Sequence, residues 1–155
     1  ADMRAAYDAL PEKKKTFLEG KIAIHSIIHS RELIGFTDYS KEERDGLPSV
    51  PHVMVRTHPG SGRKSLYLAS YAHEIEGMAT PEARMFLRDL IEHATQEQFV
   101  YTHSWRVGDL VMWDNRCTMH RARDYDNSHR RDLRRSTVME EVSTLDMPEN
   151  QAAVA

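Results

Sequence analysis

A chain of 155 residues is long enough for one domain with a hydrophobic core, and its 40% hydrophobic and 29% charged residues are typical of a globular protein. The formal net charge of −3, from 21 Lys and Arg against 24 Asp and Glu, argues against general binding to nucleic acids. A single cysteine excludes an internal disulfide, and no apolar run reaches the roughly 18 residues of a membrane-spanning helix, so we expect a cytoplasmic protein that contacts no membrane.

The N-terminal third is predicted to be helical. Residues 2–10 place apolar side chains at helical spacing, and Pro11 suits the first turn of a second helix, which we expect to run to about residue 29. Residues 35–51 hold two prolines and two glycines, which indicates a loop. Within this loop Ser40 and Glu43 have the spacing of a capping box, so a short helical turn is expected there. The predicted buried residues of the two helices are Met3, Ala6, Tyr7, Leu10, Phe17, Ile24, Ile27 and Ile28.

The pattern then changes to short strands. Residues 52–58 and 65–71 are predicted strands on either side of the glycine-rich turn 59–64, which together indicate a hairpin. A helix is expected to start at Thr80 as its cap with Pro81 in its first turn. Residues 99–105, 110–114 and 133–142 are further predicted strands, with 117–122 continuing the sheet. Helices followed mostly by strands indicate an α+β or β-sandwich arrangement. The apolar stripe of the helix is predicted to be Met85, Phe86, Leu90, Ile91 and Ala94.

Residues 113–136 combine seven arginines, two histidines and four aspartates. His120 follows a predicted strand and polar turn, and a sheet fixes the direction of such a side chain, which suits a metal ligand; a structural role is the alternative. A nucleic-acid surface is disfavoured because Tyr125 is the only aromatic residue after Trp113 in this segment and aspartates interrupt the arginines.

Arg131 and Arg135 are predicted to share one face of a strand with Leu133 between them, which indicates a partly interior face. Two guanidinium groups on such a face need anions, and carboxylates are the ligands that arginine binds in a bidentate manner. Two carboxylate ligands would meet this need. The alternatives, which the spacing leaves open, are a solvated strand face or ion pairs with the aspartates at 124, 126 and 132.

Several motifs resemble the taurine dioxygenase family of Fe(II)/2-oxoglutarate-dependent dioxygenases, and within it the 2,4-dichlorophenoxyacetate dioxygenases. They are VRTHPGSGRKSLYL, EHATQEQFVYTHSWRVGDLVMWDNRCTMHRA and RRDLRRST, and the signature is WDNR-x-x-x-H with an arginine eleven residues after the histidine. The resemblance runs from residue 1 to about 141. It implies a mainly β fold with flanking helices, a double-stranded β-helix or cupin-like jelly-roll. It also implies iron held by two histidines and one carboxylate.

The resemblance implies a role for particular residues of this chain. His120 matches a histidine ligand of the metal, Arg131 the arginine that binds the far carboxylate of 2-oxoglutarate, and Arg135 the arginine that binds the anionic group of the substrate. His58 and His103 fall on matching strands and are expected to line the substrate region. The signature residues Trp113, Asp114, Asn115 and Arg116 are expected to shape the end of the sheet around the metal ligands.

The sequence departs from the family pattern at one point. None of its nine histidines is followed two residues later by Asp or Glu, so the H-x-D/E motif that carries the other two ligands is missing. The expectation is that residues 1–155 form the C-terminal part of a single catalytic domain whose N-terminal part is missing. We expect a homo-oligomeric enzyme that uses Fe(II), 2-oxoglutarate and O2 to hydroxylate an aryloxyalkanoate. A taurine or alkyl-sulfate dioxygenase and a non-enzymatic cupin-like binding module are the alternatives.

Overall fold

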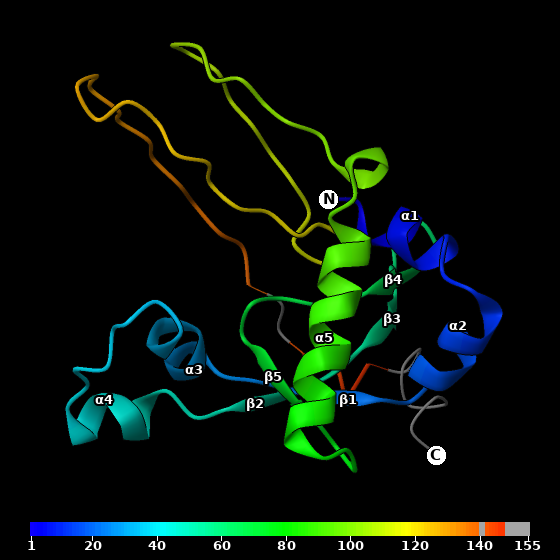
Figure 1. Ribbon diagram of the computed structural model, residues 1–155. Helices are drawn as coiled ribbons and strands as arrows, with labels where there is room; N and C mark the ends of the chain where they lie inside the picture. Colours follow the sequence, from blue (N-terminus) through cyan, green and yellow to red (C-terminus); the bar gives the residue numbers. More distant parts are fainter. Residues whose placement is uncertain (140–141, 148–155) are drawn as a thin grey trace.

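The computed structural model of the chain describes residues 1–139 and 142–147 (Figure 1). Its helices surround two small antiparallel sheets. The helices are α1 (Met3–Asp8), α2 (Glu12–Leu18), α3 (Ile27–Glu32), α4 (Lys41–Gly46), α5 (Thr80–Ala94) and the 3-10 turn η1 (Glu97–Phe99). The strands are β1 (Ile22–His25), β2 (Val50–Val53), β3 (Val55–Thr57), β4 (Lys64–Leu66) and β5 (Ala72–Ile75). The prediction of β-sheets with flanking helices is confirmed, and both sheets are antiparallel.

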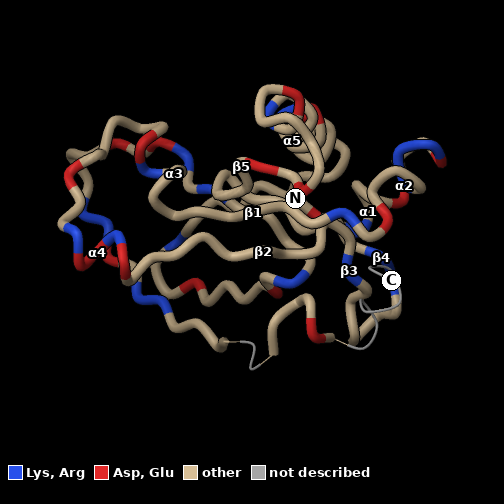
Figure 2. The backbone as a smooth tube through the Cα atoms, turned by 90° about the horizontal axis from the view of Figure 1, so that it is seen from below, with Lys and Arg blue, Asp and Glu red and all other residues tan. Residues whose placement is uncertain are grey.

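The larger sheet has the strand order β2-β1-β5, and β3 and β4 form the smaller one. Helix α5 packs against β5 and α1, while α1 also packs on β4, so these two helices bring the sheets into one core. Strands β1 and β2 carry no Lys, Arg, Asp or Glu, whereas α2, α4 and α5 carry many of them (Figure 2). None of the helices in the described residues is long and apolar enough to cross a membrane. The core consists of Met3, Ala6, Tyr7, Leu10, Leu18, Ala23, Met54, Val55, Leu66, Leu68, Ile75, Ala83, Leu87, Leu90 and Ala94.

The first helix and the capping box of α4 are confirmed. Asp2 caps α1 by accepting hydrogen bonds from the backbone N–H groups of Arg4 and Ala5. In α4 the Ser40 side chain accepts from the Glu43 N–H, and the Glu43 carboxylate accepts from the Ser40 N–H. Both caps satisfy backbone donors that a helix leaves without a partner, and they use residues within three positions of each other.

The prediction of one long helix from residue 11 to 29 is wrong. Helix α2 stops at Leu18, Gly20 adopts a positive φ of 68°, and the chain then forms the central strand β1. A positive φ is easy for glycine and ends a helix. The β-branched Ile22 and Ile24 suit a strand, and β1 is paired on one side with β2 and on the other with β5.

The predicted hairpin is confirmed, but the strand expected over residues 52–58 is two strands. Residues up to Val53 pair with β1, the chain bends at Met54, and Val55–Thr57 pairs with β4. The second strand of the hairpin is shorter than the predicted 65–71. In the turn between β3 and β4, Gly62 has a φ of 66° and the His58 N–H donates to the Arg63 carbonyl at 2.8 Å.

Helix α5 is confirmed, with two corrections. Its cap is Ala79, not Thr80, so the helix begins without a side-chain cap. Met85, predicted in the apolar stripe, is 70% exposed, whereas Leu87 is buried in its place. Helical periodicity located the buried face to within one residue, and contact with β5 and α1 determined which residue is buried.

Residues 100–139 form none of the predicted strands among their described residues. They make two extended arms that project from the end of α5 (Figure 1). The first arm, residues 100–112, turns at 106–109, and the second, residues 120–138, turns at 126–129, each closed by one backbone hydrogen bond of 3.1 Å. Leu110, Met112 and Val138 are about nine-tenths exposed, and Leu133 is 48% exposed. The prediction of a partly interior face at Leu133 is therefore wrong here, and residues 140–141 of the last predicted strand lie outside the described residues.

Candidate functional site

The turn that precedes His120 is organised around the Asp114 carboxylate. Arg116 donates to it from its backbone N at 2.8 Å, from Nε at 2.9 and 3.1 Å and from Nη2 at 2.7 Å. The hydrogen-bonded Arg116 guanidinium holds the pKa of Asp114 well below its usual range, although partial burial opposes this shift. Asp114 is thus ionised at neutral pH, and its hydrogen bonds with Arg116 hold the turn together.

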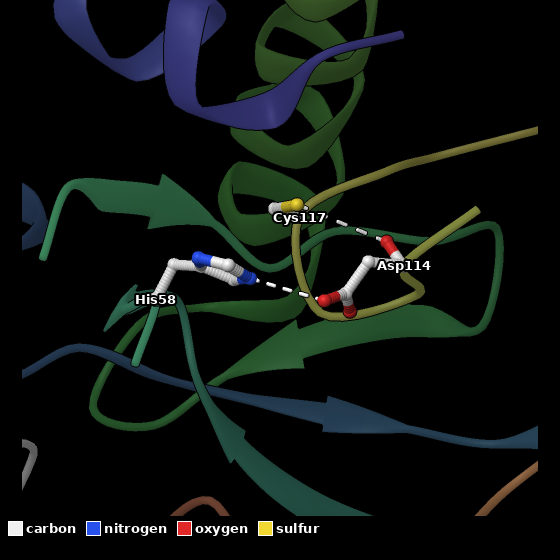
Figure 3. Close-up of side chains that lie close together, drawn as sticks. All are labelled: His58, Asp114 and Cys117. Atoms are coloured by element: carbon white, nitrogen blue, oxygen red, sulfur yellow. Dashed lines mark hydrogen bonds and ion pairs between the residues drawn. The ribbon is translucent and has the colours of Figure 1, made fainter. Parts of the chain in front are cut away.

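His58 approaches the same carboxylate from the end of β3. Its Nε2 lies 3.1 Å from Oδ2 of Asp114 (Figure 3). Its Nδ1 lies 2.9 Å from the Ser61 hydroxyl. The side chain is buried, with a residue exposure of 7%. The structure therefore places His58 inside the fold and against the turn, and its predicted role in binding substrate stays a prediction.

Within the described residues, one group brings together side-chain atoms of the kinds that bind metal ions. It consists of His58, Asp114 and Cys117, whose potential ligand atoms all lie within 4.8 Å of one another. Cys117 is buried, and its Sγ is 3.9 Å from the Asp114 carbonyl oxygen (Figure 3). The Arg116 guanidinium already contacts both carboxylate oxygens. A cation bound to Asp114 would meet this positive charge at short range, so the group is better described as a buried polar cluster than as an open metal site.

His120 follows a segment held by the N-terminal residues. Asp2 and Thr118 form an antiparallel bridge, the Met3 N–H donates to the Cys117 carbonyl at 3.0 Å, and the Met119 N–H donates to the Ala1 carbonyl at 3.1 Å. These hydrogen bonds connect the chain just before His120 to the base of α1. The direction in which His120 leaves the fold is consequently set by packed backbone.

The His120 ring is next to Trp113, with 4.9 Å between the ring centroids. Burial lowers the pKa of His120 below its usual value, and the positive charge of Arg135 lowers it further. The imidazole is therefore neutral near pH 7, which is the form that binds a metal ion. Arg135 is close enough to affect this ring.

Arg131 and Arg135 lie in the second arm and are exposed. The Arg131 guanidinium stands over the Tyr125 ring at 4.8 Å from its centroid. In the part of the chain that the structure describes, neither arginine forms an ion pair with the neighbouring aspartates; Asp132 is paired with Arg130, and Asp126 with His129. Of the open alternatives, the solvated face is the one observed, and both guanidinium groups are accessible to anions from solution.

His103 lies in the first arm, apart from the other predicted residues. Its Nε2 is 3.0 Å from Oδ2 of Asp109, and its ring meets Trp105 edge-on at 4.7 Å. The structure thus brings His120 near Trp113 and Arg135, and His58 to Asp114. It does not bring His103 or Arg131 to them in the described residues.

Sequence patterns did not reveal a histidine cluster on the larger sheet. The ring of His25 on β1 meets His52 edge-on at 5.0 Å and stacks on Tyr67 at 5.6 Å. Burial lowers the pKa of His25 from 6.5 to about 4, and the charges of His52 and His73 contribute to this. Its Nε2 is buried with no hydrogen-bond partner in the described residues. The four residues come from separate segments, so no local motif marks the cluster.

Acid is expected to destabilise the protein through His25. The unfolded chain protonates this histidine near pH 6.5, whereas the folded chain does so only near pH 4. The unfolded state therefore binds more protons between these values, and the free energy of unfolding falls by up to about 3 kcal/mol as the pH is lowered through this window. In urea unfolding from pH 7 to 4, His25→Phe should flatten this dependence and the exposed-site control His129→Phe should keep it. An unchanged pH slope in His25→Phe would contradict the prediction.

The sequence and fold of this chain are similar to those of known dioxygenases. Residues 1–137 match the family described as taurine catabolism dioxygenase TauD, TfdA family. The chain is 55% identical over 140 residues to an alpha-ketoglutarate-dependent 2,4-dichlorophenoxyacetate dioxygenase of Cupriavidus pinatubonensis, covering 90% of this chain and 49% of the relative. It is 39% identical over 131 residues to an (S)-phenoxypropionate/alpha-ketoglutarate-dioxygenase of Delftia acidovorans, covering 81% of this chain and 45% of the relative.

Among solved structures, the chain resembles AAD-2 in complex with Mn(II) and N-oxalylglycine. The TM-score is 0.88 with 54% sequence identity, over 93% of this chain and 57% of that one. The chain spans about half the length of the curated relatives it matches. Because the family match covers residues 1–137, including His120, Arg131 and Arg135, this chain belongs to the TauD/TfdA family of dioxygenases.

Proposed function

We propose that the protein containing this chain is an Fe(II)- and 2-oxoglutarate-dependent dioxygenase that hydroxylates an aryloxyalkanoate such as 2,4-dichlorophenoxyacetate. The observation that carries the proposal is the 55% identity to a 2,4-dichlorophenoxyacetate dioxygenase over 90% of the chain. The names of the other relatives support the class of substrate, since a phenoxypropionate is also an aryloxyalkanoate.

His120 is proposed as one ligand of the iron. The neutral imidazole that burial and Arg135 favour is a suitable donor, and the metal complex of AAD-2 supports a metal in this fold. The described residues place no second histidine or carboxylate in a metal-binding group with His120. The other two ligands are therefore proposed to come from an H-x-D/E motif outside this sequence.

The two accessible arginines are proposed to bind the two anions of the reaction. Arg131 would bind the far carboxylate of 2-oxoglutarate, and Arg135 the carboxylate of the substrate, each through paired hydrogen bonds. Arg135 lies close enough to His120 to affect its charge. A substrate whose carboxylate is bound by Arg135 would therefore have the carbon beside its ether oxygen near the metal. His58 and His103 remain candidates for the substrate region.

Bound iron would supply the oxidation, in which O2 and 2-oxoglutarate yield succinate, CO2 and one oxygen atom for the substrate. An aryloxyacetate hydroxylated beside its ether oxygen is a hemiacetal, which breaks down to a phenol and glyoxylate. The residues of this chain contribute by binding and orienting the two carboxylates and by holding His120 in place.

The two arms are proposed to be strands of a double-stranded β-helix. Their extended backbone forms no strand-to-strand hydrogen bonding in the described residues, and their apolar side chains are exposed. A neighbouring strand would pair with this backbone and cover these side chains. We propose that residues 1–155 are the C-terminal part of a single catalytic domain and that preceding residues supply these strands. Homo-oligomerisation and a cytoplasmic location stay predictions.

A taurine or alkyl-sulfate substrate is the second candidate. The family description includes taurine catabolism, and Arg135 would bind a sulfonate or sulfate as well as a carboxylate.

A substrate panel tests the proposal and separates the two candidates. The complete polypeptide is incubated with iron, 2-oxoglutarate and either 2,4-dichlorophenoxyacetate, 2-phenoxypropionate, taurine or an alkyl sulfate, and succinate is measured. We expect succinate with the aryloxyalkanoates, in equal amount to the phenol released. Succinate with taurine or alkyl sulfate alone would establish the second candidate, and no iron-dependent succinate with any of the four would contradict both.

A further inference from the structure

We propose that His58 is a positioning residue for the metal ligand: by binding Asp114 it holds the turn 114–117, and so the segment that carries His120. This inference rests on the proposed function, in which His120 binds iron. It gives His58 a task inside the fold rather than direct contact with the substrate.

The Asp114 carboxylate is fully used by its contacts. Oδ1 accepts from the backbone N–H and Nε of Arg116, and Oδ2 accepts from Nη2 of Arg116 at 2.7 Å and faces Nε2 of His58 at 3.1 Å. Arg116 is only two residues away and is part of the turn itself. His58 is 56 residues away and belongs to the β3–β4 hairpin, so it connects the Asp114 side chain to that hairpin, while the Met3 N–H separately connects Cys117 to α1.

His58 is itself held from several sides. Its backbone N–H donates to the Arg63 carbonyl at 2.8 Å, and its Nδ1 pairs with the Ser61 hydroxyl at 2.9 Å. A carboxylate can only accept, so Nε2 carries the proton of this contact, and Nδ1 forms a separate hydrogen bond with the Ser61 hydroxyl. Gly60 leaves space for the ring, since a Cβ at this position would lie 3.2 Å from Cε1 of His58. The ring is thus a fixed donor aimed at Asp114.

Residues on both sides of Asp114 connect the turn to His120. After Asp114, the Cys117 N–H donates to the Asp114 carbonyl at 3.2 Å, and Cys117 is buried three residues before His120. Before Asp114, the Trp113 ring lies beside the His120 ring. Rotation of Asp114 would shift both neighbours, and a partner of a metal ligand commonly changes metal affinity about 10- to 100-fold when it is lost.

The test compares three variants of the complete polypeptide. His58→Gln keeps an N–H close to the position of Nε2, His58→Phe keeps the ring and removes the donor, and His52→Phe is the matched control. His52 also uses an imidazole nitrogen, bonded to the Thr144 hydroxyl at 2.9 Å, and its ring packs against His25 and Tyr67. Mn(II) affinity is measured by titration, and the separate KM values for 2-oxoglutarate and 2,4-dichlorophenoxyacetate are measured at saturating Fe(II).

We expect His58→Phe to weaken Mn(II) binding about 10- to 100-fold with little change in KM for the aryloxyalkanoate, and His58→Gln to restore most of the affinity. The control should bind Mn(II) like the wild type. A higher KM for the aryloxyalkanoate with unchanged Mn(II) affinity would assign His58 to the substrate and overturn the inference. So would equal losses in the Gln and Phe variants.

A second measurement does not depend on iron chemistry. Hydrogen exchange of the Cys117 and Met119 amides should be faster in His58→Phe than in the wild type and unchanged in the control, and unchanged exchange in His58→Phe would overturn the inference. If the wild type binds no metal while this difference in exchange is present, the proposed function fails and the restraint on the turn stands. If His120→Ala still bound Mn(II) and His58→Phe did not, His58, Asp114 and Cys117 would be identified as a metal site. That result would overturn the inference.

Discussion

Replacing His120 by Ala in the complete polypeptide is expected to lower iron-dependent succinate formation by about 100-fold or more. In the proposed site the variant loses one protein ligand of the metal, and the loss of a ligand affects metal binding at least as strongly as the loss of a group hydrogen-bonded to that ligand. Succinate release from 2-oxoglutarate and bound iron per protein molecule are measured together. Both should fall, because the neutral imidazole that the structure places beside Trp113 is gone.

The matched control is His129→Ala. This histidine lies in the same arm, but its side chain is 82% exposed, and it is paired with Asp126 in the same turn. It should leave both quantities at the wild-type level. If the His120 variant released succinate at the wild-type rate, His120 would not be a ligand of the metal.

Replacing Arg131 by Ala is expected to raise the KM for 2-oxoglutarate about 100-fold. Loss of two charge-assisted hydrogen bonds costs about 3 kcal/mol, which corresponds to a factor of this size. Arg131→Lys should recover only part of the loss, because an ammonium group cannot form the paired geometry. Arg135→Ala should leave the KM for 2-oxoglutarate nearly unchanged and instead raise the KM for the aryloxyalkanoate.

Steady-state kinetics with each substrate varied in turn separates these two effects. Arg130→Ala is the control, since this neighbouring arginine is exposed and paired with Asp132. Equal effects of the Arg131 and Arg135 variants on both KM values would contradict the separate roles and would indicate a general effect of positive charge in the arm.

The predicted elements that were found depend on residues close together in the sequence. Helix α1, the Ser40–Glu43 capping box and the turn between β3 and β4 each follow from side chains or glycines within a few positions. The failed predictions concern segments whose structure depends on distant partners. Residues 22–25 suit either a helix or a strand, and pairing with β2 and β5 determines that they form β1.

The same division applies to the site. A local signature was enough to single out His120, Arg131 and Arg135, whose positions relative to one another are set by spacing along the chain. The contact between His58 and Asp114 joins residues 56 positions apart, and the histidine cluster around His25 joins separate segments. No local pattern encodes such contacts, because they form only when the sheets and helices pack.

By itself the sequence determined the family resemblance, the local helices and turns, and the identity of the three residues proposed to bind metal and anions. Tertiary structure alone decided that β1 is a central strand, that Arg131 and Arg135 are exposed in an arm, and that His58 is buried against Asp114. The physical reason is that propensities, caps and turns act over a few residues, whereas strand pairing, burial and pKa shifts depend on groups that only the folded chain brings together.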